Sequence, residues 1–190
     1  EPLKENESQA FQGSITLGQG FTLSENEAKQ MIAADPKNKD VLYPYLNGKD
    51  LNTHYRQMPS RWIINLFDRP EESAKLFKQP YEYILNGVRA ERLSKKDKNV
   101  RSYPWWLYWR QRAELYHAIG RGHSFEKHPK GWNPENRPSE LVLVSTRVTK
   151  HLMFSFVENS FVNDVAINTF TGKRYFEFAV LQSSIHAAFV

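Results

Sequence analysis

Aromatic and cationic side chains alternate in one short stretch of the chain, residues 101–112. Three of the five tryptophans, Trp105, Trp106 and Trp109, lie there between Arg101 and Arg112. Cations neutralise phosphates and aromatic rings pack on sugars or unstacked bases, so this combination is typical of proteins that hold nucleic acid. The tryptophans could equally belong to the hydrophobic core, because buried aromatics supply much of the packing of a mid-sized domain. The pattern leaves the tryptophans open and favours a binding role for the cations.

Positive charge is concentrated around this stretch. Residues 87–130 contain eleven Lys and Arg against four Asp and Glu, a net charge of +7, whereas the whole chain carries +5. A localised basic patch is the expected footprint of a nucleic-acid-binding surface. We expect seven of these cations to contact phosphates: Arg89, Arg92, Lys95, Lys96, Lys98, Arg101 and Arg110.

A second candidate surface is the polar connection between two apolar runs, residues 141–145 and 152–157, which are typical of strands. Such a connection could present side chains to base edges in the major groove, where each base pair shows its own donors and acceptors. An ordinary hairpin end is an equally good interpretation. Asn168, on a later strand, could pair with adenine. The candidate base-reading residues are Ser145, Arg147, Thr149, Lys150, His151 and Asn168.

Several other classes of protein are disfavoured. The chain has no cysteine, which excludes disulfides and thiolate metal sites. Three histidines, His117, His123 and His128, lack a carboxylate cluster of convincing spacing, so no metal site is predicted. No apolar run approaches the roughly 20 residues needed to span a bilayer, and no signal peptide is apparent, so a cytoplasmic location is expected.

The elements that must position these residues indicate one α+β domain, with a curved, mostly antiparallel sheet and packed helices. Residues 1–10 are expected to form a flexible arm, and residues 11–190 the domain. Ser24 and Glu27 form a capping box before a helix that should reach Ala34. A second helix is predicted from Trp105 to Ile119. The chain begins without Met and stops inside a helical pattern, so we expect a fragment of a larger protein.

Five blocks of sequence, taken together, resemble the target recognition domain of MmeI-like (type IIL/IIG) restriction-modification enzymes, over about residues 10–190. The blocks are Phe11-Gln12-Gly13-Ser14, Leu17-Gly18-Gln19-Gly20-Phe21, Pro44-Tyr45-Leu46-Asn47-Gly48-Lys49-Asp50-Leu51, Trp105-Trp106 with Arg112, and Leu181-Gln182-Ser183-Ser184-Ile185-His186. The Pro-Tyr-Leu-Asn-Gly block is the most specific of them.

The resemblance implies a domain that reads duplex DNA for catalytic domains lying elsewhere in one polypeptide. Those domains would be a DNA adenine methyltransferase, which uses S-adenosylmethionine, and an endonuclease, which uses Mg²⁺. The fragment itself is expected to bind no cofactor and to catalyse no reaction. Its own sequence agrees, because Asn133-Pro134-Glu135-Asn136 departs at two positions from the Asn-Pro-Pro-Tyr loop of amino-methyltransferases.

One segment departs from the resemblance, and two other classes of function remain open. Residues 120–140 resemble a loop insertion, which could contact DNA through Arg121, Lys127 and Lys130. Two other classes of function also fit the composition. A module for single-stranded nucleic acid or RNA would use exposed tryptophans as stacking platforms, and a protein-interaction domain would contact only a neighbouring domain or partner.

Overall fold

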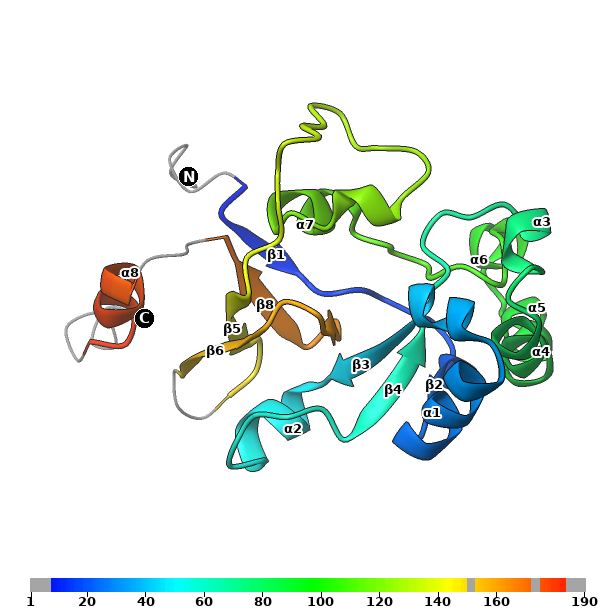
Figure 1. The fold of residues 1–190 in the computed structure, drawn as a ribbon, viewed down its shortest axis with the longest axis horizontal. Coiled ribbons are helices and arrows are strands. Elements are labelled where there is room, and N and C mark those ends of the chain that lie inside the picture. Colours follow the sequence, from blue (N-terminus) through cyan, green and yellow to red (C-terminus); the bar gives the residue numbers. More distant parts are fainter. Residues whose placement is uncertain (1–7, 150–152, 172–174, 184–190) are drawn as a thin grey trace.

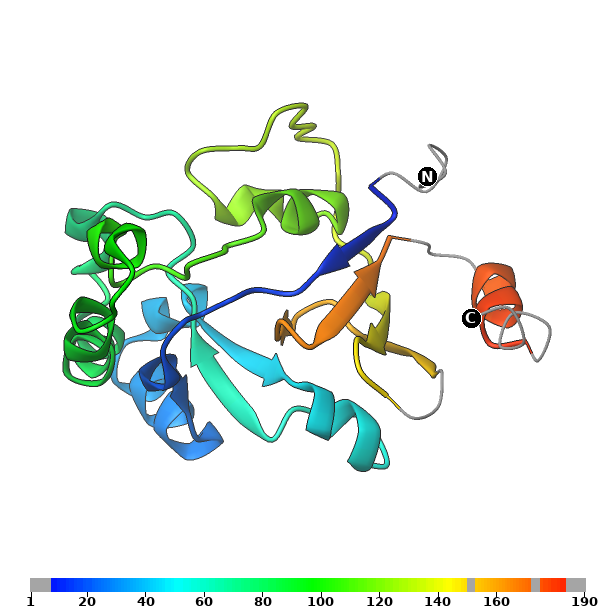
Figure 2. The same ribbon diagram turned by 180° about the vertical axis from the view of Figure 1, so that it is seen from behind.

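Two four-stranded sheets form the framework of the protein (Figures 1 and 2). The structure is a computed structural model that describes residues 8–149, 153–171 and 175–183. One sheet has the order β1-β8-β5-β6 and the other β2-β4-β3-β7. The strands are β1 (Ala10–Gln12), β2 (Thr22–Leu23), β3 (Leu42–Leu46), β4 (Arg61–Ile64), β5 (Leu141–Thr146), β6 (Phe154–Glu158), β7 (Val162–Asn163) and β8 (Ile167–Phe170).

The pairing confirms an α+β domain with mostly antiparallel strands. Only β3 and β7 pair in parallel, with Tyr45 opposite Val162. A single curved sheet was expected, and the described chain instead divides its strands between two. The reason lies after β6, where Val162 and Asn163 cross to the second sheet before β8 returns to the first. Ala10 already pairs with Phe170, so the expected flexible arm ends before residue 10.

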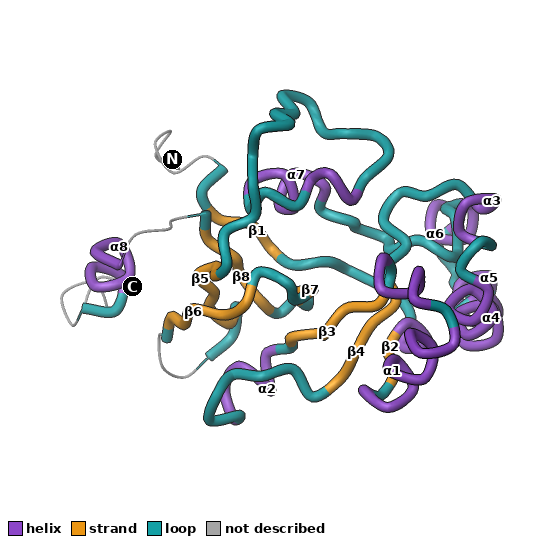
Figure 3. The backbone as a smooth tube through the Cα atoms, viewed as in Figure 1, coloured by secondary structure: helices purple, strands orange, loops and turns teal. Residues whose placement is uncertain are grey.

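Helices gather mainly at one end of the molecule (Figure 3). There α3, α4, α5 and α6 lie together, beyond the β2-β4-β3-β7 sheet and far from α8 at the opposite end (Figure 1). The α-helices are α1 (Glu25–Ala34), α2 (Gly48–Thr53), α3 (Glu71–Ala74), α4 (Lys78–Gly87), α5 (Arg89–Leu93), α6 (Lys98–Ser102), α7 (Ala113–Ala118) and α8 (Tyr175–Leu181). The 3-10 helices are η2 (Gln19–Phe21), η3 (Pro36–Asp40) and η4 (Gly122–Ser124).

The N-terminus of α1 has the predicted capping box. The Ser24 hydroxyl accepts a hydrogen bond from the backbone N–H of Glu27, and the Glu27 carboxylate accepts one from the backbone N–H of Ser24 at 2.7 Å. These bonds satisfy donors that the first helical turn leaves unpaired. The Ser24 backbone N–H and hydroxyl both donate to the Glu27 carboxylate and lower its pKa, because they favour its ionised form. The helix ends at Ala34, as predicted.

The helix predicted from Trp105 to Ile119 is wrong for its first eight residues, and only α7 is helical. Arg112, which precedes α7, has a left-handed backbone with φ of 61°. Just before it, Arg110 exchanges two backbone hydrogen bonds with Ile15, at 3.0 and 3.1 Å. This long-range bridge requires extended backbone and overrides the local preference for helix.

Buried hydrophobic residues form two main cores, one against each sheet, and a small third cluster of Phe67, Tyr116 and Phe125. The larger core lies around β2, β3 and β4 and includes Phe21, Ile63, Ile84 and Tyr108. Here η2 meets α4 so closely that a side chain on Gly20 would collide with the backbone of Gly87. The second core packs α2 and α7 against the β1-β8-β5-β6 sheet. It includes Leu46, Leu51, Leu115, Val144 and Ile167.

Candidate nucleic-acid interface

The basic segment around α5 and α6 presents four exposed cations, all of them among the predicted phosphate contacts: Arg89, Lys96, Lys98 and Arg101. Asp97 positions α6, because its carboxylate accepts a hydrogen bond from the backbone N–H of Asn99 at 2.8 Å. Lys95 is half-exposed and forms an ion pair with Glu91 at 2.9 Å. The segment therefore offers solvent a cluster of positive charge, with one of its lysines already paired.

Arg92, also predicted to contact phosphate, is a correction, because its side chain is completely buried. Its guanidinium donates to the carbonyl oxygens of Thr16 and Leu107, both at 2.8 Å, and to those of Leu17 and Pro104, both at 3.4 Å. Burial lowers the pKa of Arg92. This arginine joins the segment after β1 to the tryptophan segment, and a phosphate cannot reach it there.

The three tryptophans are all half-buried, and two of them pack against the larger core. Trp105 packs on Tyr81, with ring centroids 5.6 Å apart, and the indole N–H of Trp106 donates to the carbonyl of Arg69 at 3.1 Å. Trp109 is different, because Arg110 lies over its ring at 5.0 Å and Tyr103 meets its edge. Trp105 and Trp106 are thus mainly structural, while Trp109 orders an exposed cation.

Trp109 and Arg110 line an open, mostly polar basin of about 590 Å³. Its other residues are Tyr103, Gln111, Arg112, Ala113 and Glu114. The guanidinium of Arg112 is bonded within the protein, because it donates to the Gly13 carbonyl at 3.3 Å and to the Gln12 side chain. Arg110 keeps its exposed position, which fits its predicted role as a phosphate contact.

The predicted base-reading residues that the structure describes lie near the end of β5 and on the neighbouring strand β8. Arg147 and Thr149 are exposed, and the backbone N–H of Arg147 donates to the Ala166 carbonyl at 2.8 Å. Ser145 is buried, with 5% of its surface exposed, so it cannot read bases from this position. Asn168 is half-buried in β8 opposite Ser145. Lys150 and His151 lie outside the described residues.

The α2 helix, to which the sequence assigned no site role, lies beside the end of β5. The Asn52 side chain is 3.4 Å from the Thr146 hydroxyl, and an added Gly48 Cβ would lie in van der Waals contact with both Thr146 and Ala166. Asn47 caps the helix by accepting from the backbone N–H of Asp50 at 3.0 Å. The Asn-Gly pair therefore starts a helix. The signal that could have found this surface was the specificity of the Pro-Tyr-Leu-Asn-Gly block itself.

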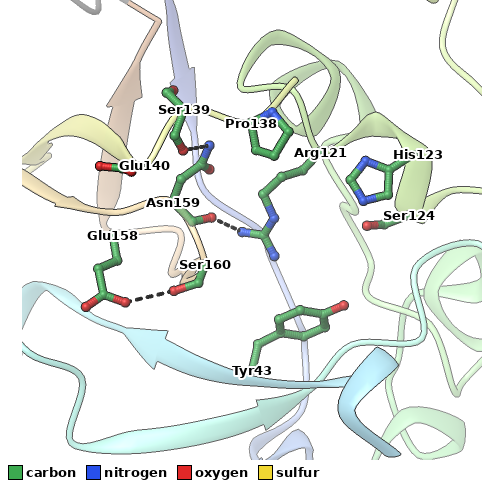
Figure 4. Close-up of a pocket in the computed structure, with 10 residues that line it drawn as sticks. All are labelled: Tyr43, Arg121, His123, Ser124, Pro138, Ser139, Glu140, Glu158, Asn159 and Ser160. Carbon is green, nitrogen blue, oxygen red and sulfur yellow. Dashed lines mark hydrogen bonds between the residues drawn. The ribbon is translucent and has the colours of Figure 1, made fainter. Parts of the chain in front are cut away.

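A separate cavity of about 570 Å³ surrounds Arg121 (Figure 4). This arginine is 6% exposed, and its Nη1 donates to the carbonyls of Asn159 and Phe161, both at 2.6 Å. Its guanidinium lies over the rings of Tyr43 and Tyr116, at 5.3 and 5.2 Å. Burial raises the pKa of Tyr43 to about 12, although the nearby Arg121 charge opposes this shift. Arg121 therefore joins β3, α7 and the turn after β6 inside the protein. This structural role corrects its expected role as a DNA contact.

The long loop after α7 is attached at both ends. Near its start, the Asp68 carboxylate accepts from the backbone N–H groups of Glu126 and Lys127, at 2.8 and 2.6 Å. Its two ends also meet, because a side chain on Gly120, which follows α7 with a φ of +81°, would collide with the backbone of Arg137 near the far end of the loop. Lys127 and Lys130 are exposed. Apart from η4, these residues form no regular structure, as the sequence predicted for this loop.

Metal binding and membrane crossing both require features that the described residues can be checked for. Within residues 8–149, 153–171 and 175–183, no group of three His, Asp or Glu side chains is arranged to hold a metal ion. None of the helices in the same ranges has the length and apolar character needed to cross a membrane.

The fold is similar to that of a known DNA-bound enzyme. The solved structure of the type IIL restriction-modification enzyme MmeI in complex with DNA matches with a TM-score of 0.62 and 14% identity, and the match covers 94% of this chain. It covers 21% of the MmeI chain, so this chain spans about a fifth of that enzyme. No family model matches the chain, and no curated protein matches it. At 14% identity, the likeness shows a related fold.

Proposed function

We propose that residues 11–190 form a target recognition domain that reads duplex DNA for a larger restriction-modification enzyme. The observation that carries this proposal is the match of nearly the whole chain to part of a DNA-bound enzyme of that class. The exposed cations supply the charge that such a role needs. Because MmeI is about five times longer than the matched part, the catalytic domains would lie outside these residues.

The two surfaces described above would divide the work of recognition. Exposed cations of α5 and α6, with Arg110, would contact phosphates and set the register of the domain on DNA. Arg147, Thr149 and Asn168, with Lys150 and His151 beyond the described residues, would lie near base edges. The larger polypeptide would add an adenine methyltransferase that binds S-adenosylmethionine and an endonuclease that binds Mg²⁺. The methyltransferase domain would be the direct protein partner.

Binding of the 190-residue chain to nucleic acids of equal length tests the proposal. Fluorescence anisotropy would compare a mixed-sequence duplex, a single-stranded DNA and an RNA across a salt series. We expect a preference for duplex, with log affinity falling steeply as log salt rises, because phosphate contacts release counterions. Tighter binding to the single strands would favour the alternative of a single-stranded nucleic-acid or RNA module. Negligible binding to all three would favour a protein-interaction domain.

Charge reversal locates the phosphate contacts. Lys96→Glu, Lys98→Glu and Arg101→Glu change exposed side chains, so the triple variant should fold normally. Loss of three phosphate contacts should reduce the salt slope by about 2.7, since each contact contributes about 0.9. The matched control is Lys37→Glu with Lys39→Glu, two exposed cations of η3. Equal losses in the two variants would contradict a localised interface.

A further inference from the structure

The loop that follows α2 exposes an aromatic side chain on a firmly built support. Tyr55 is 83% exposed, the highest value of any aromatic residue among the exposed hydrophobics of the described chain. Its ring stacks on that of His54, with centroids 5.1 Å apart and planes inclined by 26°. A single exposed hydrophobic side chain needs no explanation by itself. The structure around Tyr55 and the charges beside it carry the inference.

The loop, residues 54–60, is held by bonds from its own backbone. The ring Nδ1 of His54 accepts from the backbone N–H groups of Arg56 and Met58, at 3.3 and 3.2 Å. Gln57 has a left-handed backbone, with φ of 49°, and donates its N–H to the His54 carbonyl at 2.9 Å. These contacts fold the chain tightly around His54. Tyr55 is therefore presented from an ordered turn.

A buried carboxylate fixes the loop to α2. Asp50 is 7% exposed, and its Oδ2 accepts from the backbone N–H and the hydroxyl of Ser60, at 2.9 and 3.0 Å. The same oxygen accepts from the side-chain amide of Asn47 at 2.8 Å. One carboxylate thus holds the start of α2 and the end of the loop together. Side chains on such a support lose little conformational freedom when they bind a ligand.

The surroundings of Tyr55 are cationic. Lys49, Arg56 and Arg61 are exposed, and none of them takes part in an ion pair found in the described residues. The only acid between residues 47 and 61 is Asp50, whose carboxylate is already bonded inside the loop. The α2 helix also contacts β5, whose end carries the exposed Arg147. In both ribbon views α2 and the loop after it lie on the side of the molecule toward β5 and β6 (Figures 1 and 2).

From this combination we infer that Tyr55 stacks on a base at an opened step of duplex DNA, while Lys49, Arg56 and Arg61 bind the flanking phosphates. An aromatic face gains from stacking on any unstacked base, and cations on either side hold the backbone near it. Opening a base step costs free energy, which is smallest where pairing is already broken. This inference rests on the proposed function, because it requires duplex DNA as the ligand.

The test compares a fully paired duplex with a second duplex that differs from it only by one central mismatch. The wild-type chain should bind the mismatched duplex more tightly, because part of the cost of opening is already met. Tyr55→Ala should weaken binding to that duplex by about 5- to 150-fold, the range expected for one lost base stack. Tyr55→Phe keeps the ring and should bind like wild type. Circular dichroism melting should show no change, since Tyr55 makes few packing contacts.

Tyr175→Ala is the matched control, because Tyr175 is 73% exposed and belongs to a different element, α8. It should bind as wild type. If Tyr55→Ala binds the mismatched duplex within about twofold of wild type, the inference is wrong. If Tyr55→Ala has no effect but the triple charge reversal on α5 and α6 still weakens duplex binding, only the inference about Tyr55 fails and the proposed function stands. If the wild-type chain does not bind duplex DNA, the proposed function fails as well.

Discussion

The helical end and the sheet end of the molecule carry positive charge in different ways. At the helical end, α5 and α6 are helices of five residues each, and their cations project from short segments joined by turns. At the sheet end, Arg147 follows a six-residue strand paired on both sides, and the α2 loop is fixed by Asp50. The second support is held by strand pairing on both sides of β5 and by the hydrogen bonds of a buried carboxylate.

This difference suits two tasks in recognition. Phosphates are evenly spaced along DNA and accept a cation from many directions, so short helices can contact them without precise positioning. Base edges require donors and acceptors at defined places, and sites built on regular, well-anchored elements hold such geometry best. We therefore expect the helical end to contribute most of the affinity and the sheet end most of the sequence preference.

The largest expected effect is the loss of stability when Arg92, the buried arginine of α5, is replaced. Arg92→Leu should lower the free energy of unfolding by about 3 kcal/mol or more, because four carbonyl groups lose their donor in the interior. Urea denaturation measures the change. Lys96→Leu, at an exposed position four residues later, is the control and should have little effect. Similar stabilities for the two variants would mean that Arg92 is not a structural cation.

A smaller effect is expected at the sheet end. Asp50→Ala removes the acceptor of three hydrogen bonds and should lower the free energy of unfolding by about 2 kcal/mol. It should also weaken binding to mismatched DNA, because the loop that presents Tyr55 loses its attachment. Lys49→Ala leaves those bonds intact and serves as a control for stability. Unchanged stability in Asp50→Ala would show that the loop is held by its His54 contacts alone.

Neutralising one cation at each end of the molecule tests which end determines DNA affinity and which determines sequence preference. Lys98→Gln, at the helical end, should reduce the salt slope by about 0.9 and weaken all duplexes alike. Arg147→Gln, at the sheet end, should change the ranking of sequences selected from a random duplex pool, by about 1–3 kcal/mol at one position. The division of tasks is contradicted if Lys98→Gln alters the selected sequence and Arg147→Gln does not.

The smallest effect tests a bond that joins α3 to α4 beneath the helical end. The Tyr81 hydroxyl donates to the Glu71 carboxylate at 2.6 Å and lowers the pKa of Glu71 from its usual 4.5. Because the folded pKa is depressed, this stabilisation is present above pH 4.5 and is lost as the pH falls through the folded pKa. Glu71→Gln should therefore melt below wild type at pH 7, and the difference should shrink at low pH. A constant difference would exclude the charge as its cause.

Local patterns in the sequence predicted the elements that depend on neighbouring residues. The Ser24 capping box and the strand predicted over residues 141–145 are confirmed, because cap chemistry and short-range hydrophobic patterns decide them. The tryptophan segment was not predictable in this way. Its backbone is fixed by Ile15 and its rings by partners far along the chain, so a helical pattern gave the wrong answer.

The roles of individual arginines required the tertiary structure. Arg92 lies among exposed cations in sequence, yet its partner Thr16 is 76 residues away. Arg121 likewise bonds to carbonyls about 40 residues later. A carbonyl acceptor leaves no trace in the sequence, because every residue has one. The α2 surface was missed for a related reason, since only the fold brings it beside β5.

The contact between Gly120 and the Arg137 backbone means that the chain leaves and re-enters the domain at nearly one point. Closing a longer or shorter stretch between such points costs little, about 0.6 kcal/mol for each doubling of length. Evolution could therefore lengthen, shorten or exchange residues 128–136, which follow the buried Phe125 and the attachment to Asp68, without disturbing either sheet. The domain carries a ready-made position for acquiring a new contact or a new partner.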